Sequence, residues 1–404
     1  MLAEIKDDIN TFLYNEEKLR LDPKANAGRP YQQCTVSAMD TISDPAISFD
    51  EKGISNYYHE YQEAAKHVVT EGDEPSPELA GIVQKIKESG AGKPYDCITG
   101  VSGGVDSTYL TLQAKKLGLR PLVVHFDNGW NSELAVKNIE NIISRLEFDL
   151  YTLVVNWEEF RDLQLAYLKA SVVDIEAITD HAIIATLYKL AIEKNIKYIL
   201  SGTNIVTEAT LPAYWVFNKN DHINIRSIHK EFGSVKLKTY PFYNTRLKKM
   251  AQLRRIESVN LLNYLPYNKQ QVKQTIIREL GWKDYGGKHY ESIFTRFYQG
   301  YILPKKFHID KRKAHVSNLV FSGQITREDA FAQLQTPIYD PEQLASDYEF
   351  MLKKFGLTKE EFEKIMKLPR REHTSFETEK GFFSRYPLLT PAKPIISLLR
   401  RLRK

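Results

Sequence analysis

The chain has 404 residues, more than a usual single domain, so two or three structural units are expected. Hydrophobic residues make up 42% and charged residues 26%, as in ordinary globular proteins, and no apolar run approaches a membrane span. Two cysteines exclude a disulfide framework and the polar first residues exclude a signal peptide, so we expect a cytoplasmic protein without stable membrane insertion.

The net charge of +5 hides a strongly basic segment. Between Arg246 and Lys313 there are 16 Lys and Arg residues against 5 Asp and Glu, which gives this segment a charge of +11 and the rest of the chain −6. Such an excess suits an anionic ligand, either a nucleotide-activated metabolite or nucleic acid. A solvated basic face is the alternative.

The first part of the chain, residues 1–75, is expected to form an N-terminal extension and a small module. A short amphipathic helix around residues 5–13 precedes a polar connector, and residues 34–58 follow with a single cysteine, Cys34. One thiolate cannot hold a tetrahedral zinc ion. The Pro- and Gly-containing stretch at residues 71–77 then predicts a domain boundary.

The second part, residues 80–243, alternates predicted strands and helices, which is typical of an α/β fold with a parallel sheet covered on both faces. Strands are expected at residues 95–100, 121–127, 150–155 and 198–202. Helices are expected over residues 80–88, over residues 108–117 and over most of residues 173–194. A further helix is expected to begin after a cap at Asn131 or Ser132.

The turn after the first strand has a composition suited to phosphate. Residues 102–107 read Ser-Gly-Gly-Val-Asp-Ser, and the glycines let an anion approach free backbone N–H groups at a helix N-terminus. Bare phosphate would repel Asp106, so this carboxylate indicates a bridging Mg²⁺. No Gly-Lys-Ser/Thr follows, which excludes a Walker A loop. The alternative is a glycine turn without a ligand.

Two more polar loops follow predicted strands, at residues 127–132 and 202–208. Ligands of parallel sheets bind outside the carboxyl ends of the strands, so we expect these loops and residues 102–107 to converge on one crevice. Asp180 and His181, in the middle of a predicted helix, are either part of this site or a buried polar pair. His125 is interpreted as a core histidine whose hydrogen bonds are satisfied.

The third part, residues 244–404, is predicted to be mainly helical. A turn at Gly286-Gly287 leads through Lys288 into an aromatic-rich helix, and the aromatic stripe favours a core role over a ligand platform. Lys288 is the residue that we expect to contact pyrophosphate or a charged intermediate. Thr326 with Asp329 has the spacing of a helix N-terminus. The basic end at residues 395–404 fits either a frayed helix or contact with an anionic surface.

Residues 102–107 resemble the Ser-Gly-Gly-x-Asp-Ser pyrophosphate loop (PP-loop) of the ATP pyrophosphatases, the superfamily of asparagine, NAD and GMP synthetases. The resemblance implies an adenine nucleotide α-hydrolase-like domain at residues 80–243, with ATP and Mg²⁺ as cofactors. Gly202–Asn204 with Glu208 also resembles NAD synthetase, where the glutamate helps to hold Mg²⁺; a solvated acid is the alternative for Glu208. Asp106 and Glu208 are the implied metal ligands, and the implied ATP-binding residues are Val101, Ser102, Gly103, Gly104, Val105, Asp106, Ser107, Asp127, Gly202, Thr203 and Asn204.

Residues 127–134, 202–204 and 286–292 together look like the N-acetyl sugar amidotransferases of bacterial surface-glycan synthesis, over roughly residues 34–345. The resemblance implies an AMP-forming ligase for lipopolysaccharide O-antigen or related glycans. It converts an acetamido group of a nucleotide-activated N-acetyl sugar into an acetamidino group through an adenylylated intermediate. A separate glutaminase with a cyclase-like subunit supplies ammonia. The implied catalytic residues are Asp106, Asp180, Glu208 and Lys288, and the implied sugar contacts are Asn128, Trp130 and Asn131.

The N-terminal module departs from that family, whose members carry two Cys-x-x-Cys pairs for zinc. Cys34 stands at the first ligand position, but Ser37, Ser55 and Tyr58 replace the other three. We therefore expect a degenerate zinc-ribbon-like module without zinc, of which Cys34 is the remnant.

Two rival functions use the same loop. A PP-loop tRNA-modifying enzyme is favoured by the basic segment, but thiolation usually needs a reactive cysteine pair, and Cys97 lies in a predicted core strand while Cys34 is alone. We therefore expect no nucleic-acid partner. A non-catalytic binding subunit is the third interpretation, and the intact loop at residues 102–107 argues against it.

Overall fold

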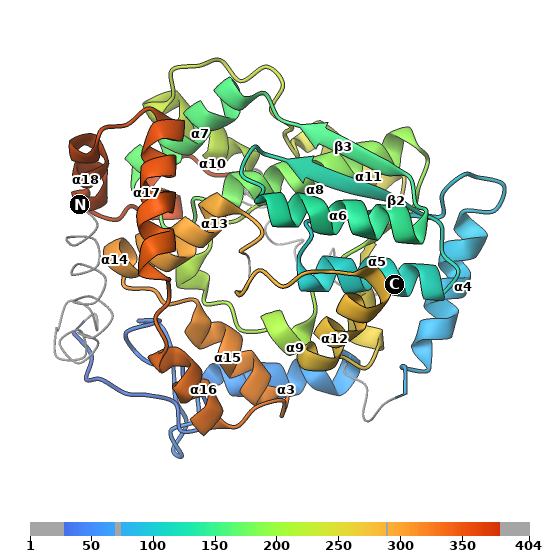
Figure 1. Cartoon of the computed structure of the whole chain (residues 1–404), viewed down its shortest axis with the longest axis horizontal. Coiled ribbons are helices and arrows are strands. Elements are labelled where there is room, and N and C mark those ends of the chain that lie inside the picture. Colours follow the sequence, from blue (N-terminus) through green and yellow to red (C-terminus); the bar gives the residue numbers. More distant parts are fainter. Residues whose placement is uncertain (1–27, 69–73, 288–289, 380–404) are drawn as a thin grey trace, which may run out of the picture.

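The computed structural model describes residues 28–68, 74–287 and 290–379. Its sheet has five parallel strands in the order β3-β2-β1-β4-β5, of which Figure 1 labels β2 and β3. The strands are β1 (Cys97–Gly100), β2 (Pro121–Asp127), β3 (Leu150–Val154), β4 (Tyr198–Leu200) and β5 (Glu257–Val259). The chain leaves β1 toward β2 on one side and returns to β4 on the other, so the topological switch point lies between β1 and β4.

The four predicted strands are present, and β5 is one that the sequence did not predict. β2 has the expected bounds, whereas β1, β3 and β4 are shorter than expected by one or two residues. β5 lies in the basic stretch after residue 244, where we expected helix. Its three residues are mostly exposed at the sheet edge, so they carry no apolar pattern that would identify a strand.

Alternate residues of the strands pack on opposite faces of the sheet, as the two-residue period of a strand requires. On one face Ile98, Leu122 and Val124 contact α8 (Ala177–Glu193). On the other face Val123 packs with α5 (Val105–Lys116), α6 (Glu133–Leu146) and α12 (Lys269–Leu280). The predicted arrangement of helices on both faces is confirmed.

Side-chain caps fix where several of the helices begin. Ser132 accepts a hydrogen bond from the N–H of Ala135 and caps α6. Thr326 and Asp329 form a reciprocal capping box at the start of α16 (Arg327–Gln335), as their spacing predicted. The other helices before residue 290 are α3 (Asn56–Val68), α4 (Glu78–Ser89), α7 (Trp157–Ala170), α9 (Ile205–Glu208), η1 (Ala213–Trp215), α10 (His222–Phe232), α11 (Thr245–Leu253) and η2 (Leu261–Tyr264).

The C-terminal region is helical, as predicted, and its aromatic residues form core. Phe294, Phe297 and Tyr301 are almost fully buried in the largest hydrophobic cluster, which also takes in residues before residue 60 and from α7 and α8. Its remaining helices are α13 (Ile293–Phe297), η3 (Tyr298–Ile302), α14 (Leu303–Phe307), α15 (Arg312–Phe321), α17 (Pro341–Phe355), α18 (Lys359–Lys367) and η4 (His373–Ser375). No helix of the described ranges is both long and apolar enough to cross a membrane.

The N-terminal module packs on α15 through a buried ion pair. The ammonium of Lys313 lies 2.7 Å from the carboxylate of Asp40, and both side chains are almost fully buried. Cys34 is buried as well and accepts a hydrogen bond from the N–H of Ser55. Within the described ranges no three His, Cys, Asp or Glu side chains cluster as metal ligands would. The predicted helix at residues 5–13 and the basic end at residues 395–404 lie outside the described residues.

Candidate active site

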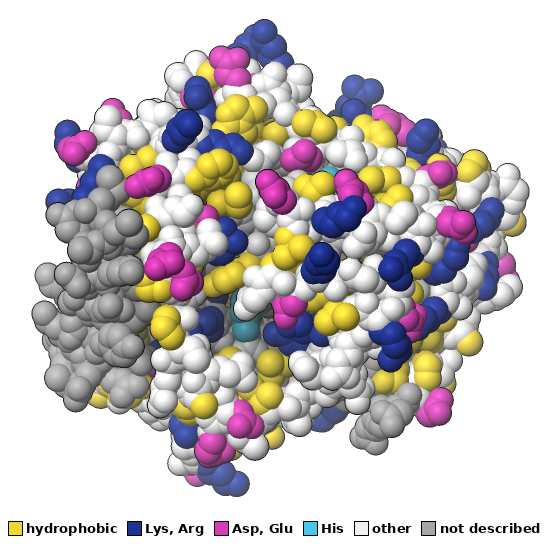
Figure 2. All heavy atoms as spheres, in the orientation of Figure 1, with side chains coloured by type: hydrophobic (Ala, Val, Ile, Leu, Met, Phe, Trp, Pro, Cys, Tyr) yellow, Lys and Arg dark blue, Asp and Glu magenta, His cyan; other side chains and the backbone are white. Residues whose placement is uncertain are grey.

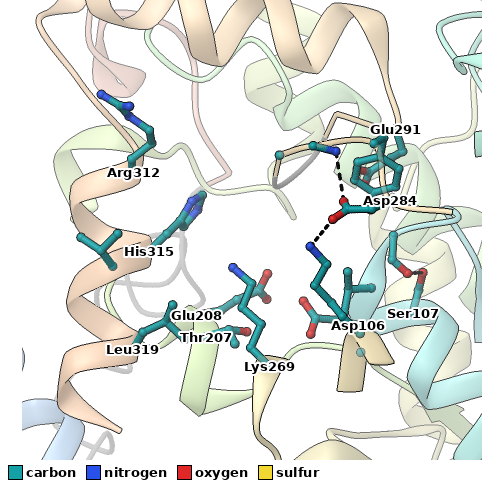
Figure 3. Close-up of a pocket in the computed structure, with 18 of the residues that line it drawn as sticks. Asp106, Ser107, Thr207, Glu208, Lys269, Asp284, Glu291, Arg312, His315 and Leu319 are labelled. Atoms are coloured by element: carbon teal, nitrogen blue, oxygen red, sulfur yellow. Dashed lines mark hydrogen bonds and ion pairs between the residues drawn. The ribbon is translucent and has the colours of Figure 1, made fainter. Parts of the chain in front are cut away.

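A cavity of about 530 Å³ opens beside the carboxyl ends of β1 and β4. One wall is formed by residues 102–107 and 202–208, and the opposite wall by α15 and residues 333–336 (Figure 3). Figure 2 shows this face hollowed near its centre, with Lys and Arg side chains around the hollow and a histidine inside it. The cavity thus lies at the switch point of the sheet, where ligands of such folds bind. We call it the main cavity.

The loop at residues 102–107 has a backbone that requires glycine. Gly103 has a positive φ of 81°, and a Cβ there would lie 3.0 Å from the backbone oxygen of Ala135. The carbonyl of Gly103 accepts a hydrogen bond from the indole of Trp282, which fixes the turn from behind. Gly104 is the N-cap of α5, so the first N–H groups of that helix face the cavity.

The serine hydroxyls of this loop lie around the same helix N-terminus. The oxygens of Ser102 and Ser107 are 3.2 Å apart, and the N–H groups of Ser102 and Gly104 donate to them. Backbone donors, hydroxyls and the positive end of α5 therefore converge at one point. This arrangement can bind a phosphate group.

Asp106 is held in a fixed orientation by two donors. The hydroxyl of Tyr267 and the amide nitrogen of Asn204, at 3.3 Å, both donate to its Oδ1 atom. Burial and then the neighbouring Asp106 raise the pKa of Tyr267 well above its usual value, so the phenol stays protonated as a donor. Asn204 also caps α9, which ends with Glu208.

The carboxylates of Asp106, in the first turn of α5, and Glu208, at the end of α9, line the same cavity (Figure 3). Mg²⁺ is typically bound in proteins through one or two carboxylates together with substrate phosphates. Two oxygen ligands beside a phosphate-binding loop therefore fit the predicted metal.

Basic residues on the remaining walls were missed by the sequence analysis. Lys269 and Lys273 lie one turn apart at the start of α12 and line the cavity, as do Arg312 and His315 of α15. Lys273 forms an ion pair with Asp284. The signal in the sequence was the +11 segment, which contains Lys269, Lys273 and Arg312 and ends just before His315, but it does not show which of its charges face a ligand.

Other charges of that segment are paired within the protein. Arg296 forms a nearly buried ion pair with Asp347, at 2.7 Å, and Lys313 pairs with Asp40. Lys306 donates to backbone carbonyls at the end of α18. Some of the positive charges of the segment are therefore paired inside the protein, and others line the cavity. Fewer remain on the outer surface to bind a nucleic acid.

The loop after β2 does not line the main cavity, contrary to the expected convergence of three loops. Its polar groups bond to each other, because Asp127 accepts from the amide of Asn131 and Asn128 accepts from the N–H of Trp130. Trp130 is fully buried against aromatic rings and donates to Gln164, which leaves no surface for a sugar. The switch point explains the difference, since β2 lies on the far side of β1.

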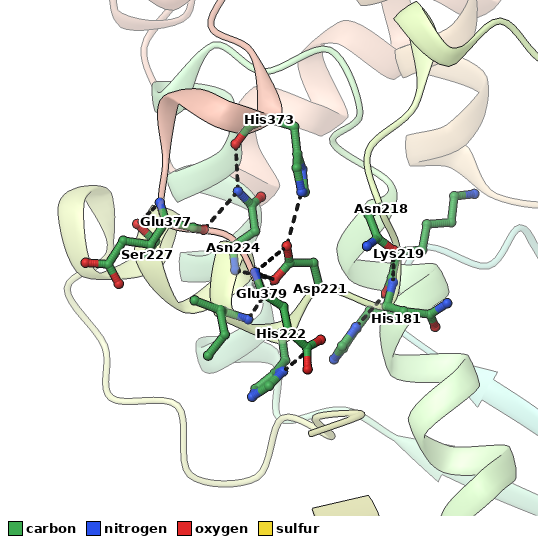
Figure 4. Close-up of polar contacts among 12 residues, drawn as sticks. His181, Asn218, Lys219, Asp221, His222, Asn224, Ser227, His373, Glu377 and Glu379 are labelled. Atoms are coloured by element: carbon green, nitrogen blue, oxygen red, sulfur yellow. Dashed lines mark hydrogen bonds and ion pairs between the residues drawn. The ribbon is translucent and has the colours of Figure 1, made fainter. Parts of the chain in front are cut away.

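Asp180 and His181 do not line the main cavity, and each of them contacts Lys219; Figure 4 shows His181 beside that lysine. Asp180 forms an ion pair with Lys219. The two ring nitrogens of His181 lie 2.6 Å from the carbonyl of Lys219 and 2.9 Å from the N–H of Tyr243, so Nδ1–H donates and Nε2 accepts. His181 is therefore a buried histidine with both ring nitrogens bonded, whereas Asp180 is partly exposed and pairs with Lys219 instead of His181, so the two residues do not form a buried polar pair.

The other predicted site residues divide into three groups. Ser102, Gly104, Val105, Ser107, Gly202 and Thr203 line the cavity with Asp106 and Glu208. Val101 is buried behind the loop, and Gly103 and Asn204 support it without lining the cavity. Lys288 lies outside the described residues.

Comparison with known proteins links the C-terminal region to one family. Residues 291–390 match the family model described as LPS biosynthesis protein WbpG-like, C-terminal domain. No curated protein sequence matches the chain.

Three solved structures show low similarity to the chain. The NH3-dependent NAD synthetase of Campylobacter jejuni is 13% identical, with coverage of 77% of this chain and 99% of that one and a TM-score of 0.28. The NMN synthetase of Francisella tularensis is 13% identical (54% and 90% covered, TM-score 0.28), and the NAD+ synthetase of Burkholderia pseudomallei is 15% identical (55% and 94%, TM-score 0.28). At these identities and TM-scores, the three structures do not indicate a function.

The family match is the informative comparison. Over residues 291–390 the chain is similar to the WbpG-like proteins of lipopolysaccharide biosynthesis, in agreement with the surface-glycan family that its motifs resemble.

Proposed function

We propose that the protein is an ATP-dependent, AMP-forming amidotransferase that converts the acetamido group of a nucleotide-activated N-acetyl sugar into an acetamidino group. The main observation that supports this proposal is the phosphate-binding loop at residues 102–107, whose Asp106 shares one cavity with Glu208. The other wall of that cavity belongs to the segment that matches a lipopolysaccharide biosynthesis family. The product would enter lipopolysaccharide O-antigen or a related surface glycan.

The loop would hold the β,γ-pyrophosphate of ATP. The N–H groups at the start of α5 and the hydroxyls of Ser102 and Ser107 face the position where this anion would lie. Asp106 and Glu208 would hold Mg²⁺, which neutralises phosphate charge when bound. Lys269 and Lys273 line the same cavity; Lys273 is paired with Asp284, and the ammonium of Lys269 would add positive charge near the leaving pyrophosphate.

The proposed reaction has two steps. First, the acetamido oxygen attacks the α-phosphorus of ATP, the bond to the β-phosphate breaks, and pyrophosphate leaves with the electron pair. Ammonia then adds to the activated carbon, AMP leaves with the former acetamido oxygen, and loss of a proton yields the amidine. Because amide oxygen is a weak nucleophile, the protein contributes mainly positioning and charge neutralisation.

Ammonia would come from a separate glutaminase that acts with a cyclase-like subunit. The chain has two cysteines and both are buried, so neither is accessible as the nucleophile of a glutaminase. Burial and then the adjacent Asp96 raise the pKa of the Cys97 thiol well above its usual value, which makes it a poor nucleophile.

The test is to incubate the protein with ATP, Mg²⁺, ammonium and a panel of nucleotide-linked N-acetyl sugars, with total tRNA as a parallel acceptor. We expect AMP in equal amount to a sugar that has lost oxygen and gained NH. Asp106→Asn should abolish both products. Asp149→Asn is the matched control, because Asp149 is exposed at the start of β3 and does not line the cavity.

The other outcomes separate the rivals. AMP formed only with tRNA would replace this proposal with the tRNA-modifying enzyme. AMP and pyrophosphate formation that Asp106→Asn leaves intact would show that the loop is not the reaction centre.

A further inference from the structure

A smaller chamber adjoins the main cavity along α15. It has a volume of about 180 Å³ and shares Arg312, His315, Thr336 and the glycine pair Gly286-Gly287 with the main cavity. All its other lining residues lie between residues 290 and 338, almost entirely inside the segment that matches the WbpG-like domain. The phosphate-binding loop contributes nothing to this second chamber.

A π-helical turn forms part of the wall of the second chamber. Gln299 and Gly300 lie in η3, where the backbone departs from α-helical spacing between α13 and α14, and such turns are frequent at functional sites. The side-chain nitrogen of Gln299 donates to Glu176 over a long 3.4 Å, and its Oε1 atom accepts no hydrogen bond from a described residue. The chamber therefore contains an acceptor oxygen on a largely buried side chain.

The charges of the chamber do not cancel. Arg312 and Asp310 neutralise each other in a pair with distances of 2.8 to 3.1 Å, and Arg312 also donates to the carbonyl of Thr336. Lys311 lies 5.8 Å from the ring centre of Tyr298 and makes no direct ion pair with a carboxylate of the described ranges, although the buried Asp174, which does not line the chamber, attracts it together with Lys219. The lining of the chamber itself therefore carries one more positive than negative charge.

We propose that the second chamber binds the sugar acceptor, with an oxyanion of the acceptor at Lys311 and a hydroxyl or N–H group donating to Gln299. This inference rests on the proposed function. The acetamido group would then point into the main cavity, toward the phosphate-binding loop. The assignment replaces Asn128, Trp130 and Asn131, which the structure does not bring to either cavity.

The oxyanion is either a carboxylate of the sugar or a phosphate of its nucleotide link, and three probes distinguish them. N-acetylneuraminate carries a carboxylate without phosphate, UDP-N-acetylglucosamine carries phosphates without a sugar carboxylate, and N-acetylglucosamine carries neither. Their dissociation constants are measured by calorimetry on the full chain and on the variants Lys311→Met and Gln299→Met. Lys364→Met is the matched control, since Lys364 is exposed on α18 and lines neither cavity.

We expect one anionic probe to bind more tightly than N-acetylglucosamine. Lys311→Met should weaken that probe about tenfold, because a hydrogen bond to a charged group is lost. Gln299→Met should weaken all probes that bind, and Lys364→Met none. Binding of α,β-methylene ATP should be unchanged in every variant, which also confirms that each is folded.

The inference fails if neither anionic probe binds better than the neutral sugar, or if Lys311→Met leaves both unchanged. Such a result with normal AMP formation would reject the chamber and keep the proposed function. Sugar binding that depends on Lys311 without any AMP formation would reject the proposed function and keep the chamber as a sugar site.

Discussion

His181 provides a prediction whose size follows from its surroundings. The imidazole is fully buried, stacks on Tyr240, and has both ring nitrogens hydrogen-bonded to backbone groups (Figure 4). Because Nε2 accepts from the N–H of Tyr243, the ring must be neutral, and protonation would replace this bond by a clash of two donors. Burial is the largest cause that lowers the pKa of His181 from 6.5 to about 4.

The sign of the effect on stability follows from this depressed pKa. As pH falls below 6.5, the unfolded chain takes up a proton at His181 while the folded protein does not, so the free energy of unfolding decreases. The loss starts near pH 6.5 and is complete near pH 4. Over that window it amounts to roughly 3 kcal/mol, of which about 2 kcal/mol is lost by pH 5.

The assay is urea unfolding, followed by tryptophan fluorescence at pH 7 and pH 5, of the wild type and of His181→Asn. The variant will be less stable at both pH values, since the amide replaces only one of the two hydrogen bonds. The wild type should nevertheless lose about 2 kcal/mol more than the variant between pH 7 and pH 5. Other titrating groups are common to both proteins and cancel in this difference. Equal losses would refute the neutral, buried state of His181.

Three further predictions concern the loop, the N-terminal module and the metal ligand. Gly103→Ala, at a positive φ and without room for a Cβ, should destabilise the fold by at least about 1 kcal/mol in urea unfolding; an unchanged midpoint would contradict the strained turn. Asp40→Asn leaves the ammonium of Lys313 buried without its charge partner and should cost about 3–5 kcal/mol, much of it recovered in Asp40→Asn with Lys313→Met; equal losses in both variants would contradict the ion pair. Tyr267→Phe should weaken Mn²⁺ binding, measured by electron paramagnetic resonance, about tenfold with little change in Tm; unchanged Mn²⁺ binding would show that Tyr267 does not position Asp106.

The central sheet was predictable because its strands carry local signals. The run Pro121–Asp127 is apolar and bounded by turn residues, and the structure reproduces its bounds. β5 has three residues at an edge and therefore no pattern to detect. Strand order is a different matter, since it depends on long-range pairing that no short stretch encodes. Without knowledge of the order β2-β1-β4, nothing separates the loop at residues 127–132 from the other two loops.

The candidate site was predictable on one wall only. The phosphate-binding wall is continuous in sequence and its glycines have a recognisable spacing. The opposite wall combines side chains from α12, α15 and residues 333–336, which are joined only by folding. Composition indicated an excess of positive charge in this region, but the pairing of Arg296 with Asp347 and the exposure of Lys269 to the cavity depend on tertiary contacts.

The buried contact between Asp40 and Lys313 has a consequence for shortened or chimeric chains. Lys313 lies in α15 between Arg312 and His315, so the helix that forms the far wall of the cavity is anchored from the N-terminal module. A chain trimmed to begin at α4 would keep the whole loop at residues 102–107. It would lack Asp40, so the ammonium of Lys313 would be buried in that wall without this carboxylate. A hybrid that joins residues 80–379 to a relative's N-terminal module would need a matching carboxylate at position 40, because this carboxylate holds α15 in place.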